Sequence, residues 1–202
     1  MGLPLQPDLT PWTPGQRRWL VITLVMAATI LLAILAHARQ QPPRLLGNDG
    51  HAGHDDYHAA AIRLIDGARR RVTVVLYVMR LDDDGPVEHL VQALSTAARR
   101  GVEVVVVLDR GRDWHTGGVD GKHLEPAERL ARSGVRVVLD EEERTTHAKV
   151  LVVDDRHVVI GSYNWTRSAL IANREWSLQI EDEHIAAQIQ TELATLPGWK
   201  ER

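Results

Sequence analysis

The sequence predicts an α/β fold: a mixed, mainly parallel sheet with helices on both faces, preceded by one N-terminal transmembrane helix. Three apolar strands alternate with amphipathic helices, which is typical of a parallel sheet that is buried on both faces. Two later apolar runs flank a short polar turn and predict an antiparallel hairpin in the same sheet. A long uncharged stretch near the N-terminus predicts the transmembrane helix.

The uncharged stretch runs from Trp19 to Ala36 and follows a tail at residues 1–18. Its 18 residues, if helical, would span roughly 27 Å, close to the thickness of the hydrocarbon core of a bilayer. We therefore expect a membrane anchor. A cleavable signal segment is the alternative, because Ala36, His37 and Ala38 form a small-x-small pattern at the end of the stretch.

Arginines flank the stretch on both sides, so the positive charges give only a weak preference for its orientation. We expect a single-pass membrane protein whose folded domain lies outside the cytoplasm. Cleavage near Ala38 would instead give a secreted or periplasmic protein. Residues 37–56 are polar and contain several Pro and Gly residues, which predicts a linker, and the folded domain is expected at residues 57–202.

The first part of the folded domain alternates between helices and strands. Pro86 suits the first turn of the second helix, and Gly101 suits the position just after that helix ends. The expected elements, in chain order, are a helix from Tyr57 to about Ala68, a strand at 72–79, a helix at 86–100, a strand at 102–109, a glycine-rich loop at 110–121, a helix that ends near Gly134 and a strand at 135–140.

The order of elements changes in the last third of the chain. The apolar runs at 147–153 and 157–161 flank Asp155 and Arg156, which predicts an antiparallel hairpin. A further strand is expected at 175–180, and a closing helix at 183–196.

A motif of fixed spacing begins at the first residue of this hairpin. The sequence matches the pattern HxKx4Dx6GSxN without a gap. The motif residues are His147, Lys149, Asp154, Gly161, Ser162 and Asn164. Because side chains at positions i and i+2 of a strand point to the same face, His147 and Lys149 are expected to meet the same ligand.

These residue types suit attack on a phosphodiester. A neutral imidazole is a nucleophile near pH 7, and a carboxylate on its other nitrogen would fix its tautomer; Glu175 is the candidate for that role. The attack adds negative charge to the phosphate oxygens, so hydrogen-bond donors around them lower the barrier. Lys149, Ser162 and Asn164 are the candidate phosphate-binding donors.

The motif resembles the HKD motif of the phospholipase D superfamily, and the resemblance covers roughly residues 57–196. It implies a phospholipase D-like fold and a two-step hydrolysis in which His147 forms a phosphohistidine. A second histidine then protonates the leaving oxygen and activates water. The resemblance also implies that Asp154 and Gly161 belong to the structural part of the motif, and that neither a metal nor another cofactor is needed.

The chain carries one copy of the motif, whereas the implied chemistry needs two histidines. A two-fold homodimer would bring His147 of each subunit to one shared active site. With no cysteine in the sequence, disulfides and thiolate metal sites are excluded.

The substrate is less well determined by the sequence. Small one-motif relatives are commonly nucleases, which favours a nuclease acting on DNA or RNA. A phospholipase D acting on membrane lipids is the alternative, favoured by the expected anchor and by a formal net charge of only −3. A binding module that uses the motif without turnover is a third hypothesis. Trp114 and His115, in the glycine-rich loop, are candidate substrate contacts.

Overall fold

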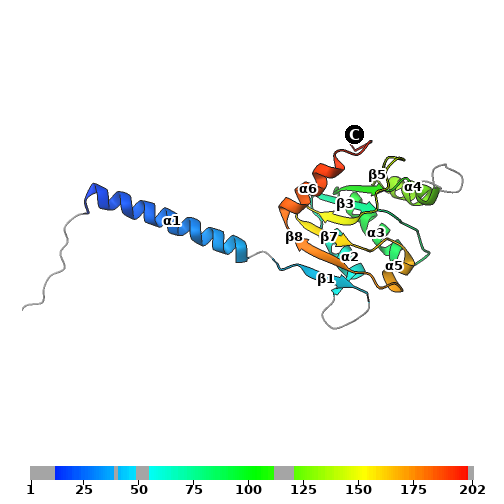
Figure 1. Cartoon of the computed structure of the whole chain (residues 1–202), viewed down its shortest axis with the longest axis horizontal. Coiled ribbons are helices and arrows are strands. Elements are labelled where there is room, and N and C mark those ends of the chain that lie inside the picture. Colours follow the sequence, from blue (N-terminus) through cyan, green and yellow to red (C-terminus); the bar gives the residue numbers. More distant parts are fainter. Residues whose placement is uncertain (1–11, 39–40, 49–54, 112–120, 200–202) are drawn as a thin grey trace, which may run out of the picture. The chain divides into compact units, whose positions relative to one another are not determined.

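The computed structural model describes residues 12–38, 41–48, 55–111 and 121–199. The chain divides into two compact units, residues 1–41 and residues 42–202. The first contains helix α1 (Pro14–Ala38), and the second contains the sheet and the other helices (Figure 1).

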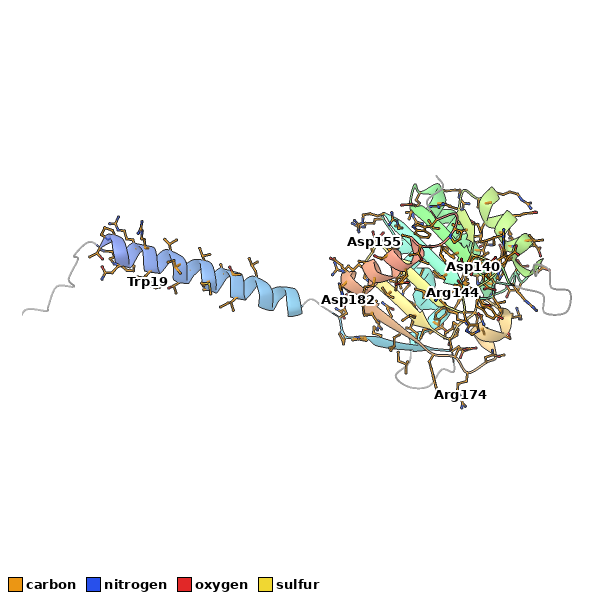
Figure 2. All side chains as sticks on the ribbon, turned by 45° about the horizontal axis from the view of Figure 1, so that its top comes forward. Trp19, Asp140, Arg144, Asp155, Arg174 and Asp182 are labelled. Carbon is orange, nitrogen blue, oxygen red and sulfur yellow. The ribbon has the colours of Figure 1, made fainter. Side chains whose placement is uncertain are left out.

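Helix α1 includes a segment, Pro14–Leu32, that is long and apolar enough to cross a membrane. Apolar side chains project from all around the helix (Figure 2), and Trp19 is 70% exposed. The hydroxyl groups of Thr23 and Thr29 donate to the carbonyl groups four residues earlier, each at 2.9 Å. Those bonds satisfy the polar groups within the helix, as an apolar environment requires. Length and composition fit a membrane anchor and a signal segment equally.

The folded unit is built on an eight-stranded mixed sheet with the order β2-β1-β8-β7-β6-β3-β4-β5. The strands are β1 (Arg44–Gly47), β2 (Asp55–Asp56), β3 (Arg71–Leu76), β4 (Glu103–Leu108), β5 (Arg136–Leu139), β6 (Lys149–Val153), β7 (His157–Gly161) and β8 (Ser177–Glu181). β3, β4 and β5 are parallel, and so are β1 and β2; the remaining pairs are antiparallel. Within this sheet, β6 and β8 therefore run opposite to the other strands, and the predicted mixed α/β fold is confirmed.

Helices cover both faces of the sheet, as predicted. They are α2 (Tyr57–Gly67), α3 (Pro86–Arg99), α4 (Leu124–Arg132), α5 (Arg167–Ile171) and α6 (Glu183–Leu193), with a short 3-10 turn at Gly121–His123. Strand β3 shows the two layers: Val74 and Leu76 belong to the core under α2 to α5, whereas Val75 belongs to the core under α6. This alternation follows from the two-residue period of a strand.

The predicted linker at residues 37–56 is wrong in part, because the folded unit begins near Pro42 and not at Tyr57. Strand β1 pairs with β8 in antiparallel register, and Leu46 is fully buried under α2. Prolines and glycines around a four-residue strand obscured it in the sequence. The physical reason for the strand is that the backbone N–H and C=O groups on the side of β8 away from β7 need hydrogen-bond partners, which β1 supplies.

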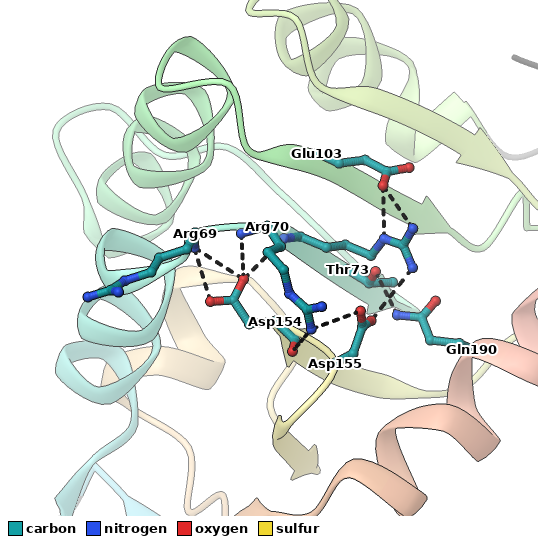
Figure 3. A network of polar contacts seen from close by, with 8 residues as sticks. Arg69, Arg70, Thr73, Glu103, Asp154, Asp155 and Gln190 are labelled. Carbon is teal, nitrogen blue, oxygen red and sulfur yellow. Dashed lines mark hydrogen bonds and ion pairs between the residues drawn. The ribbon is translucent and has the colours of Figure 1, made fainter.

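Asp154 ties the β6–β7 turn to the start of β3 (Figure 3). Its carboxylate accepts hydrogen bonds from the backbone N–H groups of Arg69, Arg70 and Arg71, the shortest being 2.8 Å from Arg70. Asp154 and Asp155 both have a φ of 54°, the left-handed conformation that tight hairpin turns use and that Asp tolerates. Burial raises the pKa of Asp154, but the three N–H groups outweigh it, so its pKa lies below the ordinary value.

Replacing Asp154 by Ala should lower the free energy of unfolding by about 1–3 kcal/mol, because three N–H groups lose their acceptor. The folded-state pKa is the lower one, so the ionised carboxylate stabilises the fold above the unfolded pKa of about 3.9. That stabilisation is lost as the pH falls through the folded pKa. Urea unfolding of the full-length wild-type and Asp154→Ala proteins in detergent, from pH 7 to pH 3, should show that the difference between their free energies of unfolding becomes smaller in acid. The control is Asp83→Ala, on an exposed loop.

Candidate active site

His147 and Lys149 lie where β6 begins, beside the end of β3. Lys149 is paired with Leu76, and the carbonyl oxygen of Ala148 accepts a hydrogen bond from the N–H of Tyr77 at 3.0 Å. The regular strand therefore starts two residues later than predicted, but the chain is held against β3 up to Ala148. The carboxyl ends of β3, β4 and β5 lie at this same edge, a favoured ligand position in α/β sheets.

The ammonium group of Lys149 faces the His147 ring. Lys149 Nζ lies 3.0 Å from His147 Nδ1, 3.3 Å from His147 Nε2 and 2.7 Å from the His147 carbonyl oxygen. Lys149 is only 8% exposed, whereas His147 is exposed. Because an ammonium group can only donate, the ring nitrogen that it faces carries a lone pair. A ring nitrogen with a lone pair is the atom that can act as a nucleophile.

The ring of Tyr77 completes this cluster. Its centroid lies 4.2 Å from that of His147, and Lys149 Nζ lies 4.9 Å from the centre of the Tyr77 ring. The face of an aromatic ring attracts a cation, so Tyr77 favours the position that Lys149 occupies.

The charge of Lys149 is balanced by two carboxylates. Burial lowers the pKa of Lys149, while the negative charges of Glu175 and Asp109 raise it; the net shift is downward. Glu175, the predicted partner of His147, is half-buried and accepts a hydrogen bond from Asn173 at 3.1 Å. Its electrostatic effect falls on Lys149, and its role in orienting His147 stays a prediction.

Gly161 and Ser162 hold the chain close to the start of β8. The N–H of Ser162 donates to the Trp176 carbonyl oxygen at 3.0 Å, and the N–H of Trp176 donates to the Ser162 hydroxyl at 3.2 Å. A Cβ atom at Gly161 would lie 2.2 Å from the Trp176 carbonyl oxygen and from the Ser177 hydroxyl. Any side chain at this position would clash with that backbone and displace it, so only glycine fits here.

Asn164, the third predicted phosphate-binding residue, is half-buried after β7. In the part of the chain that the structure describes, its buried Oδ1 atom has no hydrogen-bond partner. A buried acceptor without a partner is costly and is typical of functional sites.

Asp109 and His123 lie behind the site and were not identified in the sequence. Asp109 is 1% exposed and its Oδ1 atom accepts a hydrogen bond from the N–H of Thr146 at 2.9 Å. His123, 2% exposed, accepts from the N–H of Met79 at 3.0 Å and lies 2.6 Å from the Asp109 carbonyl oxygen. The sequence signal that could have identified Asp109 as a site residue is its position directly after an apolar strand.

A cavity of about 450 Å³ opens beside His147 on the α6 face of the sheet. Its apolar lining consists mainly of Val75, Val150, Ile189, Leu193 and Leu196. Arg144 lines it as well, from the segment just before His147 (Figure 2). The carboxylates of Glu141 and Glu192 line it too, so the cavity places apolar surface, one cation and two acidic side chains next to the expected nucleophile.

Two further sequence predictions concern the glycine-rich loop and metal binding. Trp114 and His115 lie outside the described residues. Within residues 12–38, 41–48, 55–111 and 121–199, no group of three His, Asp or Glu side chains is placed to hold a metal ion.

Comparison with known proteins places the chain in a family. A family model described as "Cardiolipin synthase, PLD-like domain" matches residues 61–196. Cardiolipin synthase B of Salmonella typhi is 26% identical over 159 residues, covering 71% of this chain and 37% of that protein. Phospholipase D of Rickettsia bellii is 32% identical over 94 residues, covering 46% of this chain and 43% of that protein. The chain thus spans well under two thirds of the length of either relative.

The fold also matches solved structures. The crystal structure of Nuc, a phospholipase D family member from Salmonella typhimurium, superposes with a TM-score of 0.59 at 22% identity. The match covers 75% of this chain and 90% of Nuc.

Proposed function

The chain belongs to the phospholipase D superfamily, whose members act on phosphodiesters, and we propose that it is a metal-independent phosphodiesterase in which His147 forms a phosphohistidine. The observation that carries this proposal is the contact of Lys149 Nζ with the His147 ring at 3.0 Å. This contact supports the proposal, because an imidazole and an ammonium group so close together could both reach one phosphate group.

The proposed reaction has two steps. A ring nitrogen of His147 bonds to phosphorus while the bond to the leaving oxygen breaks, and a second imidazole gives that oxygen its proton. Water then gives a proton to the second imidazole and attacks the phosphohistidine, which restores His147. Lys149, Ser162 and Asn164 would hold the phosphate oxygens in both steps.

The second imidazole is proposed to come from a second copy of the chain. His123 lies near the site, but its Nε2 accepts the Met79 N–H and its Nδ1 points to the Asp109 carbonyl oxygen. Both ring nitrogens are therefore used by the backbone, and His123 cannot shuttle a proton. A two-fold dimer would instead bring the His147 rings together.

An exposed apolar row gives this dimer a candidate surface. Ile160, Leu178 and Leu45 are directly paired across β7, β8 and β1, and are 42%, 43% and 38% exposed. Val150, which lines the cavity beside His147, is the next residue in the row. Covering this row with a second copy would bury apolar surface next to the site that needs the second histidine.

A nucleic acid is the first candidate substrate. The single motif copy and small folded unit resemble the one-motif nucleases, and an extended single strand would reach an exposed histidine such as His147. With a formal net charge of −3, recognition of the backbone would depend on local cations such as Lys149 and Arg144.

A membrane phospholipid is the second candidate, and the cavity favours it. Five apolar side chains line the space next to His147, as an acyl or alkyl group attached to the phosphate would require. The related proteins named cardiolipin synthase B and phospholipase D favour the same substrate class.

Hydrolysis of single-stranded DNA, duplex DNA, RNA and phosphatidylcholine, compared side by side in a chelator, tests the function and the substrate. The wild-type chain should stay active in chelator, and His147→Asn should lose activity by about a thousandfold or more because the nucleophile is gone. Mass spectrometry after an alkaline quench should find His147 bonded to the phosphoryl group with its remaining ester substituent. Activity that disappears in chelator, or that survives in His147→Asn, would contradict the proposal.

Mixing subunits tests the shared site. Wild-type and His147→Asn chains, unfolded and refolded together in equal amounts, should retain about one quarter of the wild-type activity, because random pairing gives two intact histidines in a quarter of dimers. Independent monomeric sites would retain half. Separately refolded chains mixed afterwards are the control.

We also propose that α1 anchors the protein, with the folded unit outside the cytoplasm. The apolar segment Pro14–Leu32 supports the anchor. Arginines flank the uncharged stretch on both sides, so they favour this orientation only weakly. N-terminal sequencing of the protein from membranes should find residues before Ala38. A mature chain that begins after Ala38 would show a cleaved signal segment instead.

A further inference from the structure

We propose that Asp109 is a positioning residue of the active site: its buried carboxylate fixes the chain that leads into His147 and provides a counter-charge for Lys149. This inference rests on the proposed function, because it explains how that function's nucleophile and cation are held. Asp109 is not part of the HxKx4Dx6GSxN motif.

The sheet brings Asp109 to the motif from another strand. β4, β3 and β6 are neighbours, and Leu108, Leu76 and Lys149 lie side by side across them. Asp109 follows Leu108 directly, and its N–H donates to the Leu76 carbonyl oxygen at 3.1 Å. The carboxylate therefore lies at the strand ends where the site is built.

The hydrogen bond to Thr146 holds the segment that carries His147. His147 lies before the first residue of β6, so strand pairing alone does not fix it on both sides. After His147, the Ala148 carbonyl oxygen is bound by Tyr77; before it, the Thr146 N–H is bound by Asp109 Oδ1 at 2.9 Å. With both flanks bound to neighbouring strands, the exposed imidazole keeps a defined position.

The backbone of Asp109 is itself fixed. A ring nitrogen that accepts an N–H carries no proton, so the Met79 N–H assigns the neutral His123 tautomer with its proton on Nδ1. That proton points to the Asp109 carbonyl oxygen, 2.6 Å away. His123 is 2% exposed, so this support is shielded from water.

Asp109 also acts on the charge of Lys149. Among the described residues, Lys149 Nζ lies against the His147 ring and carbonyl oxygen and the Tyr77 ring, and the carboxylates of Glu175 and Asp109 act on its charge. Asp109 is the more deeply buried of the two carboxylates, so water screens its charge less. A lysine that binds phosphate must keep its proton, and a buried counter-charge favours the protonated form.

Asp109→Asn separates the two roles, because Asn keeps an oxygen acceptor for Thr146 and loses the charge. The chain has three lysines, Lys122, Lys149 and Lys200, so the Lys149 side chain can be followed by carbon NMR in the full-length protein in detergent. Removing a carboxylate that raises the pKa of Lys149 should move its titration to lower pH. The alkaline limb of the pH–rate profile should move in the same direction.

Asp109→Ala should in addition lower kcat by on the order of tenfold to a hundredfold at the pH optimum, because the His147 segment loses one of its two ties. Asp140→Asn is the matched control: Asp140 is 2% exposed at the end of β5 and accepts from the Arg110 N–H. It should leave the Lys149 titration in place. Glu175→Gln is the positive control, which should shift the titration of Lys149 to lower pH.

Two results would overturn the proposal. One is an Asp109→Asn protein with the wild-type Lys149 titration, while Glu175→Gln shifts it. The other, measured on the unmodified chain and independent of how variants fold, is a Thr146 amide that exchanges with solvent as fast as that of Thr145. Absence of hydrolysis in the wild-type chain would instead contradict the proposed function, and both NMR measurements would still decide the role of Asp109.

Discussion

The antiparallel pairing of β6 with β3 is the constraint on which the site depends. It puts Lys149 opposite Leu76 and so brings the motif to the carboxyl ends of β3 and β4. A slip by one residue would turn Lys149 to the other face of the sheet. Asp154 prevents such a slip from the far end of β6, because its carboxylate binds the three N–H groups that precede and begin β3. Lys149, which begins β6, and Asp154, which directly follows it, thus have different tasks: Asp154 fixes the register, and the position of Lys149 depends on that register.

The second constraint is the cost of burying a lysine. A buried ammonium group without counter-charges would lose its proton, and with it the attraction for phosphate. Here Glu175 and Asp109 oppose the effect of burial, and the Tyr77 ring lies against the cation. Phosphate recognition at the proposed site would therefore be local and compatible with a net charge of −3 for the whole chain.

The parts of the fold that could be predicted are those with local signals. Helix α3 has Pro86 in its first turn, and the long apolar strands are bounded by turn residues, so their positions were predicted closely. β1 and α5 were missed because four and five residues carry no readable period. β1 pairs with the distant β8, and α5 lies against the distant α3. The motif was visible as spacing. Asp109 was not, since its contact with Thr146 joins positions 37 residues apart.

The proposed dimer contact and the cavity beside His147 share one apolar surface. The apolar row of Ile160, Leu178 and Leu45 continues through Val150 into the cavity beside His147. In the proposed dimer, a partner that covers the row would also lie close to the cavity. It would then restrict the size of the substrate group that can enter the cavity. The apolar area available to a lipid chain would then depend on how far the partner extends over Val150. A substitution in the row that weakens the dimer should thus change substrate preference as well as rate, since the same side chains serve both contacts.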